Sequence, residues 1–311
     1  MDEILRIHDK FFKDVFKNEE NTRALLRNSL PSALNSRIDY SFFSIDTSNH
    51  ISPQFDEGFS DLVAKTRIKT ASGDFQFLDV YILIEHKSYL DNAVFIQLLW
   101  YMVSMWQEDL KNKVPLRVII PIVFYHGESK WTIPVSFVDK FDVDEEVKKY
   151  LLDFQYTLFD TTQIDLWDER HAGLRENLYF FTSVAVMKYA VIQDWEGIRS
   201  LFRLWYEKGF IMELEIIQFT LKYIAKTCKV EPEKLKTLLD ESHLDGGAIM
   251  ETLYTEIHSK GMQEGKQESA QNALKEGLSD ETISRIFGFT LEEVRAFRNA
   301  KYTDKKFQTT N

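Results

Sequence analysis

The chain has 311 residues, of which 44% are hydrophobic, so it can bury a sizeable core in one large domain or in two to three smaller ones. Its single cysteine, Cys228, excludes an internal disulfide framework and a cysteine-based zinc site, and is compatible with a reducing cytosol. The net charge of −11 argues against strong non-specific DNA binding, because proteins that hold DNA by its phosphates usually carry a basic patch.

The first third of the chain is expected to contain helices and then strands. Residues 4–30 predict one or two helices, because apolar side chains recur at helical spacing up to Pro31, which cannot continue a helix. The expected extended segments that follow are, in chain order, Asp39–Ser44, Ile51–Phe55, Ser60–Ile68 and Phe75–Lys87. The centre of the last segment is continuously apolar, which is typical of a strand covered on both faces.

A helix and a third strand are predicted next. Apolar residues from Phe95 to Trp106 have the spacing of a buried stripe and predict a helix over Asp91–Asp109. Val118–Tyr125 reads as a buried strand that ends at His126. The order helix, strand, strand, helix, strand favours an α/β fold with a mixed sheet flanked by helices.

No segment is expected to enter a membrane. The longest apolar run, Val118–Tyr125, is far shorter than the roughly 20 residues that span a bilayer. Residues 1–8 carry early acids and lack the apolar run of a signal peptide. The chain is therefore expected to be cytoplasmic.

The rest of the chain is expected to be helical and to end in a small module. Leu166–Leu239 predicts several helices with aromatic anchors, added to the α/β core. In the tail, Ser279–Phe287 and Thr290–Asn299 predict a helix pair, with Thr290 and Glu293 forming a capping box. Its expected core is Ile283, Ile286, Phe287, Leu291, Val294 and Phe297. The predicted domains are a core at 1–160, a helical region at 161–260 and a tail module at 261–311.

The tail pair resembles a helix-turn-helix, which would place its second helix in a DNA groove. Glu292 and Glu293 lie at the start of that helix, the end that normally meets bases and phosphates. A helical hairpin used for packing or oligomerisation therefore remains an equal alternative.

Charged side chains gather at one end of the two long predicted strands. Glu85 and Lys87 lie two residues apart and project to the same face, whereas His86 projects to the other. Asp61, on the neighbouring strand, can sit beside Glu85. Two carboxylates at one end of a sheet provide the oxygen ligands that suit Mg²⁺ or Mn²⁺. Such a metal would polarise a phosphate and activate water, while Lys87 would position that water or offset negative charge.

Plainer explanations remain open for each of these residues. Charged residues often flank a buried strand because the chain has reached water, and Asp61 could simply begin a strand. Gln97 and Tyr101 lie four apart on the predicted helix and share a face, from which they could touch substrate, but Tyr101 also fits a core position. His126 is interpreted as a strand-end residue with a backbone partner.

The order of these residues resembles a known active-site pattern. Asp61, Glu85-His86-Lys87 and Gln97-Leu-Leu-Trp-Tyr101 are similar to the pattern of the PD-(D/E)xK nuclease superfamily and of its RecB-like branch. Ser60 stands where the name of the superfamily has a proline. Further resemblance to the recombination-promoting nuclease / putative transposase family lies in Phe11–Pro31, Leu83–Ser88 (LIEHKS) and Pro121–Gly127 (PIVFYHG).

The resemblance implies a restriction-endonuclease-like fold and a DNA endonuclease that requires a divalent metal. It implies that Asp61, Glu85 and the main-chain carbonyl of His86 are metal ligands. It also implies that Lys87 is the catalytic lysine and that Gln97 and Tyr101 orient the substrate. Many members place a further acid on the first helix, for which Glu19 and Glu20 are candidates without a secure alignment.

The sequence thus predicts a Mg²⁺- or Mn²⁺-dependent DNA endonuclease, linked to recombination or mobile DNA. Its partner is DNA, no membrane is involved, and homo-oligomer formation is left open. One alternative is a non-catalytic DNA-binding or transposon-associated protein that uses the tail. Another is a protein-interaction protein on a nuclease-like scaffold, whose acidic surface meets its partner.

Overall fold

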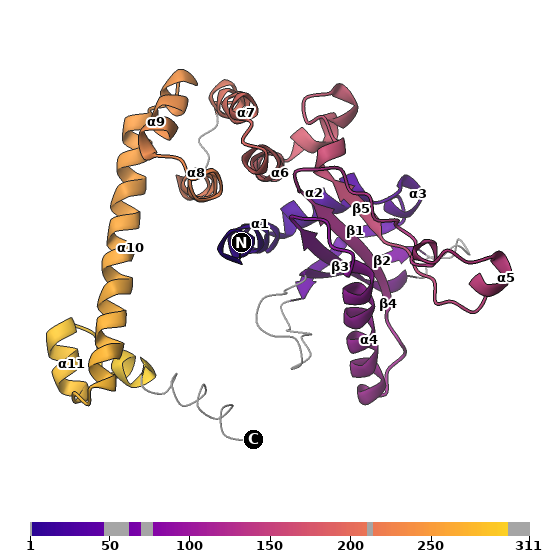
Figure 1. The fold of residues 1–311 in the computed structure, drawn as a ribbon, viewed down its shortest axis with the longest axis horizontal. Coiled ribbons are helices and arrows are strands. Elements are labelled where there is room, and N and C mark those ends of the chain that lie inside the picture. Colours follow the sequence, from indigo (N-terminus) through magenta and orange to yellow (C-terminus); the bar gives the residue numbers. More distant parts are fainter. Residues whose placement is uncertain (1, 47–61, 70–76, 210–213, 298–311) are drawn as a thin grey trace. The chain divides into compact units, whose positions relative to one another are not determined.

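The computed structural model describes residues 2–46, 62–69, 77–209 and 214–297. Their contacts divide the chain into two compact units, Met1–Leu244 and Asp245–Asn311 (Figure 1). The expected domain boundaries near residues 160 and 260 stay predictions. The expected strand at Ile51–Phe55 lies outside the described residues, as do Ser60 and Asp61.

A five-stranded mixed sheet forms the centre of the first unit (Figure 1). Its strands, in both chain and spatial order, are β1 (Ile38–Asp46), β2 (Leu62–Lys69), β3 (Phe77–Lys87), β4 (Val118–Tyr125) and β5 (Thr157–Asp160). The first three strands pair antiparallel, whereas β3, β4 and β5 run parallel. The carboxyl ends of the parallel strands therefore meet at one end of the sheet, with Lys87, Tyr125 and Asp160 in register.

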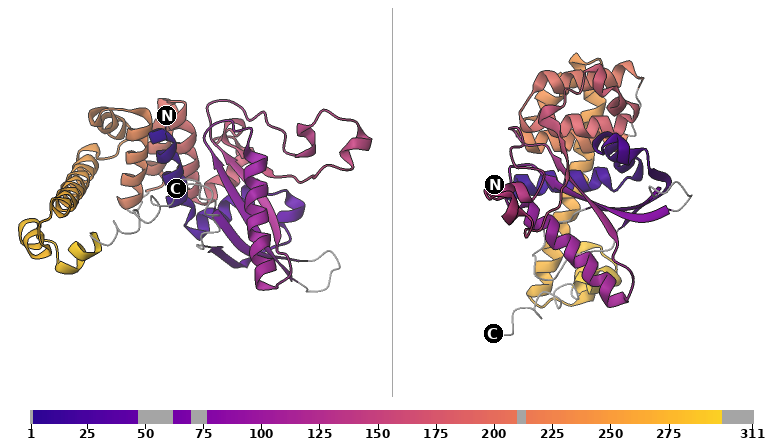
Figure 2. Two further views of the ribbon diagram at one scale, coloured as in Figure 1. Left: turned by 60° about the horizontal axis from the view of Figure 1, so that its bottom comes forward. Right: turned by 90° about the vertical axis from the view of Figure 1, so that its right-hand side faces the viewer.

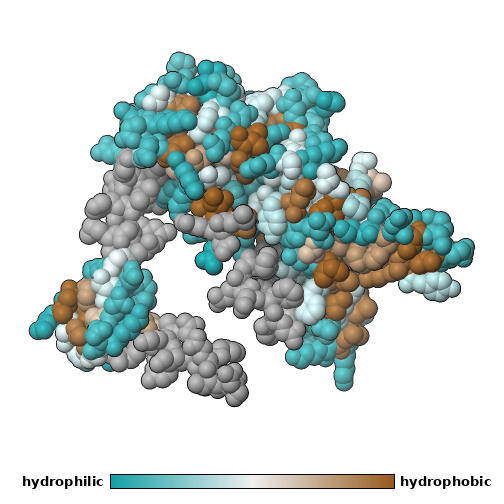
Figure 3. Space-filling view, viewed as in Figure 1, coloured by the Kyte–Doolittle hydropathy of each residue, from teal (hydrophilic) through white to brown (hydrophobic). Residues whose placement is uncertain are grey.

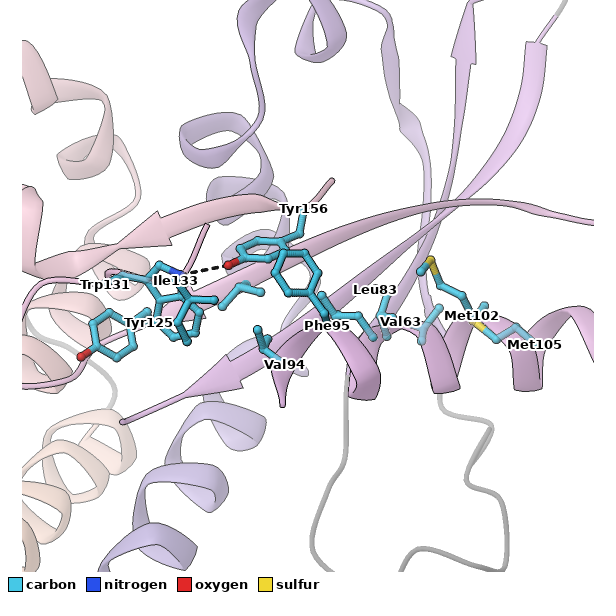
Figure 4. Packing of buried hydrophobic residues seen from close by; sticks show 12 residues of the cluster. Val63, Leu83, Val94, Phe95, Met102, Met105, Tyr125, Trp131, Ile133 and Tyr156 are labelled. Carbon is cyan, nitrogen blue, oxygen red and sulfur yellow. Dashed lines mark hydrogen bonds between the residues drawn. The ribbon is translucent and has the colours of Figure 1, made fainter. Parts of the chain in front are cut away.

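One face of the sheet is covered by α4 (Val94–Asn112). Its buried stripe includes Phe95, Leu98 and Met102, which pack in one cluster with Leu83 of β3 and Val123 of β4 (Figure 4). At one end of this cluster the Trp131 indole donates a hydrogen bond to the Tyr156 hydroxyl, at 2.9 Å. The expected buried helix and its apolar stripe are therefore present, with the helix displaced by three residues toward the C-terminus.

The opposite face of the sheet is covered by the N-terminal helices (Figure 2). Phe12 and Phe16 of α1 pack their rings against Phe124 of β4. The α-helices in the described part of this unit, besides α4, are α1 (Asp2–Phe16), α2 (Glu19–Ser29), α3 (Ser32–Asn35), α5 (Glu145–Lys148), α6 (Leu178–Val191), α7 (Trp195–Glu207), α8 (Leu214–Cys228) and α9 (Pro232–Glu241). The last four confirm the expected helical region, and α1 packs against α6 and α8.

The structure confirms the predicted fold class. A mixed sheet flanked by helices on both faces is consistent with a restriction-endonuclease-like fold. The strand predicted at Val118–Tyr125 has those bounds, and the strand before it ends at Lys87 as expected. These two ends matter most, because they position the charged residues at the carboxyl end of the sheet.

Exposed apolar side chains also occur on the outer side of α4. Ile96 is 56% exposed and Leu110 66%, although the other side of the same helix is buried. Figure 3 shows apolar patches over this part of the first unit. None of the helices in the described residues is both long enough and apolar enough to cross a bilayer.

The second unit contains α10 (Gly246–Lys275) and α11 (Asp280–Phe287), and residues 291–297 are also helical. The backbone N–H groups and side chains of Thr290 and Glu293 form the expected reciprocal capping box. Ile283 and Val294 are buried as predicted, but together with Ala270 of α10. Ile286 and Leu291 were wrongly placed in this core, since they are 57% and 39% exposed. The long helix supplies the packing surface that these two residues were expected to provide.

Candidate active site

Glu85 and Lys87 form a buried ion pair at the carboxyl end of β3. Lys87 Nζ lies 2.8 Å from Glu85 Oε1, and their side chains are 2% and 3% exposed, respectively. Both side chains point to the α4 face, because Lys87 Nζ also donates to Gln97 Oε1 of that helix, at 2.5 Å. His86 points to the opposite face, where it contacts Asp9 of α1. The alternation predicted for these three residues is therefore present.

The lysine is held in the charged state by its neighbours. Burial by itself lowers the pKa of Lys87, but the carboxylates of Glu85 and Asp91 outweigh burial and raise it. Asp91 Oδ2 accepts a hydrogen bond from Lys87 Nζ, at 2.9 Å. Three side chains thus fix the ammonium at one point near the end of the sheet.

One oxygen of the buried carboxylate lacks a protein partner. Glu85 Oε2 is shielded from solvent and accepts no hydrogen bond from the described residues. Buried carboxylate oxygens are normally paired, because an unpaired buried polar atom loses its solvation without compensation. A hard divalent cation is one group that fits such an atom. The donor chemistry of Glu85 is therefore compatible with the predicted metal.

The backbone beside Glu85 offers a second predicted ligand. The carbonyl of Lys87 accepts a hydrogen bond from the His126 N–H on the β4 side, at 3.1 Å. Carbonyls of successive strand residues point to opposite sides, so the His86 carbonyl points to the β2 side. On that side Leu62 pairs with Ile84. Asp61 precedes Leu62 in the chain but lies outside the described residues.

Among the described residues, no group of three or more histidine, cysteine or acidic side chains is arranged to hold a metal. Within that part of the chain, Glu85 is thus the carboxylate on which the predicted metal site depends. The proposed ligand set depends on Asp61 for its second carboxylate.

The two predicted helix residues differ in their contacts. Gln97 reaches the Lys87 ammonium, whereas Tyr101 is half-buried and packs against the apolar cluster under α4. Asp91 was not predicted, although it lies four residues after Lys87 and just before α4. Its other carboxylate oxygen accepts from the Ala93 N–H, at 2.9 Å, so it also shapes the turn into the helix.

Histidines form a cluster on the other face of β3. His86 Nδ1 lies 2.9 Å from Asp9 Oδ1, and His86 Nε2 lies 2.8 Å from His126 Nε2. His8 stacks edge-on against His126 and hydrogen-bonds to the Tyr223 hydroxyl, at 2.7 Å. Burial lowers the pKa of all three imidazoles, that of His8 to about 4. The imidazole of His126 therefore faces away from Glu85 and has a side-chain partner that its sequence context did not reveal.

The two acids named as unaligned candidates for a first-helix ligand lie on α2 and have other partners. Glu19 and Glu20 both form ion pairs with Arg23 on α2. The acid of α1 that contacts β3 is Asp9, which binds the His86 ring behind the candidate site. Asp9 was missed because its contact joins residues that are 77 positions apart.

Residues 6–207 match the family described as "Putative transposase, YhgA-like". The chain belongs to this family. The chain is similar to the recombination-promoting nuclease RpnA of Escherichia coli (strain K12), which is 23% identical over 298 residues, or 93% of this chain and 96% of RpnA. The inactive recombination-promoting nuclease-like protein RpnE of the same strain is 24% identical over 85% of this chain and 86% of its own length.

A third relative is the recombination-promoting nuclease RpnD of Escherichia coli O157:H7, which is 25% identical over 50% of this chain and 59% of RpnD. No solved structure matches the chain. The suspected family is confirmed, while the PD-(D/E)xK superfamily and the individual site residues stay predictions.

Proposed function

We propose that this YhgA-like chain is a divalent-metal-dependent DNA endonuclease, in line with the names of RpnA and RpnD. The observation that supports it best is the buried Glu85–Lys87 pair, whose carboxylate keeps one oxygen without a protein partner. A divalent cation, a cationic side chain and a fixed polar side chain close together are groups that metal-dependent phosphodiester hydrolysis uses.

Each residue then has a distinct task in the proposed reaction. Glu85 Oε2, the His86 carbonyl and Asp61 would hold Mg²⁺ or Mn²⁺. The bound metal would polarise the scissile phosphate and lower the pKa of a water molecule. Lys87 would offset the negative charge that develops on the phosphate oxygens. Gln97 and Asp91 would keep the Lys87 ammonium in place, and Tyr101 would orient the substrate.

A second candidate function is non-catalytic DNA binding or protein interaction on the same scaffold. It is favoured by the relative RpnE, which is named inactive, and by the closed set of partners around Lys87. In that case the ion pair would serve the packing of α4 on the sheet. A cytoplasmic location and homo-oligomer formation stay predictions for both functions.

Cutting of supercoiled plasmid distinguishes these functions. The wild-type chain is expected to nick or linearise plasmid with Mg²⁺ or Mn²⁺ and to leave it intact with EDTA. Asp61→Ala and Glu85→Gln are expected to slow cutting by about 10²-fold or more, as removal of a transition-state contact does elsewhere. Glu207→Gln, which removes an exposed carboxylate on α7, serves as the matched control.

Equal cutting by Glu85→Gln and the wild type would remove this residue from the mechanism. DNA binding without any metal-dependent cutting would favour the non-catalytic function. The absence of both binding and cutting would favour the protein-interaction function.

A further inference from the structure

A pocket of about 540 Å³ opens at the carboxyl end of β5, the edge strand of the sheet. It is lined by residues from α2, from the segment that follows β4, and from the two 3₁₀ helices η2 (Thr161–Gln163) and η3 (Glu169–Glu176). Open α/β sheets commonly bind ligands outside the carboxyl ends of their parallel strands. The pocket therefore lies where this architecture favours a ligand.

The pocket shares one end of the sheet with the candidate active site. Lys87, Tyr125 and Asp160 are in register across β3, β4 and β5, and Asp160 lines the pocket. Two strand spacings amount to about 10 Å. A nucleic-acid strand that reached Glu85 and Lys87 could extend along this end of the sheet to the pocket.

The segment after β4 contributes a basic side chain, that of Lys130, to the pocket. Gly127 passes so close to the Tyr125 ring that a Cβ there would lie 2.1 Å from its hydroxyl oxygen. That hydroxyl donates to the Ser129 carbonyl, at 2.6 Å, and Asp160 Oδ2 accepts from the Trp131 N–H, at 3.1 Å. These contacts fix the chain on both sides of Lys130, which lines the pocket.

The lining is basic although the chain is acidic. Three basic side chains, those of Arg27, Lys130 and Arg170, line the pocket against the single carboxylate of Asp160, in a chain of net charge −11. Asp160 Oδ1 accepts from the Thr162 N–H, at 2.9 Å, so both of its oxygens are occupied by the protein. Asp168 pairs with Arg170.

Two of the three cations remain available to a ligand. Neither Arg27 nor Lys130 forms an ion pair with a carboxylate of the described residues. The Arg27 guanidinium lies over the Tyr40 ring of β1, at 4.7 Å from its centre, a contact that does not neutralise its charge. Asn28 and Gln163 also line the pocket, and each of their amide nitrogens donates one hydrogen bond within the protein, to the Ala24 carbonyl and to Thr162 Oγ1. This set of donors suits a phosphate group, which accepts several charge-assisted hydrogen bonds.

We infer that this pocket binds a backbone phosphate of a nucleic-acid strand through Arg27 and Lys130, beside the bond that the Glu85–Lys87 site would cut. The inference rests on the proposed function for its choice of substrate. It explains how an acidic chain can hold DNA, because cations concentrated at one place attract phosphates that the molecule as a whole repels.

Fluorescence anisotropy with a labelled DNA duplex tests the pocket in EDTA, where no cutting occurs. Each phosphate contact contributes about 0.9 to the slope of log affinity against log salt. Arg27→Ala/Lys130→Ala is expected to weaken binding on the order of tenfold or more at about 0.1 M salt and to lower that slope by about one, because the two side chains share one phosphate. Lys130→Ala alone is expected to lower the slope by less than the double variant does.

The matched control is Lys111→Ala/Arg203→Ala, which removes the same charge from exposed positions on α4 and α7. Unchanged affinity in this control and weaker binding in the pocket variants would support the inference. Equal binding by all variants would overturn it. The inference would also be overturned if the pocket variants lost binding of inorganic phosphate but kept their affinity for the duplex. The ligand of the pocket would then be free phosphate.

The same variants separate this inference from the proposed nuclease activity. If duplex binding depended on Arg27 and Lys130 but no metal ion supported cutting, the phosphate site would be supported and the proposed endonuclease activity would be refuted. If the wild type cut DNA in a metal-dependent way but the pocket substitutions did not change duplex affinity, the endonuclease activity would be supported and the phosphate site would be refuted.

Discussion

At the scale of single residues, the buried pair between Glu85 and Lys87 couples the candidate chemistry to stability. Lys87→Ala would leave the carboxylate of Glu85 buried without its counter-ion. Removing one partner of such a pair typically lowers the free energy of unfolding by about 3–5 kcal/mol. Urea denaturation followed by circular dichroism should therefore show a clear loss of stability, separate from any loss of activity.

The double variant Glu85→Gln/Lys87→Met provides the control for this effect. It removes both charges of the pair and nearly preserves side-chain volume, so part of the lost stability should return, while Asp91 and Gln97 still lose their bonds to the ammonium. Additive losses in the double variant would mean that the two side chains do not interact energetically. Because Glu85→Gln keeps the shape of the side chain, it is a better probe of catalysis than an alanine at Lys87.

Gly127 is the second residue whose identity the structure explains. A methyl group there would overlap the hydroxyl end of the Tyr125 ring, which is only 1% exposed and cannot easily move. Gly127→Ala should lower the free energy of unfolding by about 1–3 kcal/mol, the usual range for overpacking. Gly173→Ala is the control, because its Cβ would meet only Asn28 Oδ1, at 3.5 Å. Similar thermal melting of the two variants would contradict this explanation.

At the scale of elements, buried imidazoles attach α1 to the sheet and to α8. His8 of α1 contacts His126 at the end of β4 and the Tyr223 hydroxyl of α8. Burial, followed by the neighbouring His86, lowers the pKa of His8 from 6.5 to about 4. Such a cluster is stable while its rings are neutral, because a buried positive charge would lack sufficient solvation.

The lowered pKa of His8 gives the first unit a pH-dependent stability. Between pH 6.5 and about pH 4 the unfolded chain binds a proton at His8 that the folded chain does not, so stability falls as the pH falls. The full shift corresponds to about 3 kcal/mol by pH 4. Urea titrations across this range should show a steeper loss in the wild type than in His8→Gln. Parallel curves for the two chains would show that His8 does not carry the effect.

Local patterns in the sequence were sufficient for the elements that carry the site. The apolar run of β4 ends sharply at polar residues, so both of its bounds could be predicted, and the two-residue period of β3 placed Glu85 and Lys87 on one face. The contact between His8 and Tyr223 spans 215 positions and leaves no local signal. The exposed faces of Ile286 and Leu291 could not be predicted either, because they depend on where α10 packs.

At the scale of the whole molecule, a bound metal should stabilise the fold. A ligand that binds only the folded chain raises the free energy of unfolding by about 1.4 kcal/mol at ten times its dissociation constant. Mg²⁺ or Mn²⁺ should therefore raise the melting temperature of the wild type, and Glu85→Gln should lose this shift. An equal shift in both chains would place the cation elsewhere and would remove the unpaired Glu85 oxygen as its ligand.

The division into two units predicts that the tail can lose its packing without affecting the candidate site. Glu85, Lys87 and their contacts lie in the first unit, whereas Val294 is fully buried in the core of the second. Val294→Asp places an unpaired charge in that small core and should unfold it, because a buried charge without a partner is strongly unfavourable. Hydrogen exchange should then speed up in residues 265–297 and stay unchanged in β3 and β4. Metal-dependent plasmid cutting should persist in this variant, and its loss would show that the chemistry requires the tail.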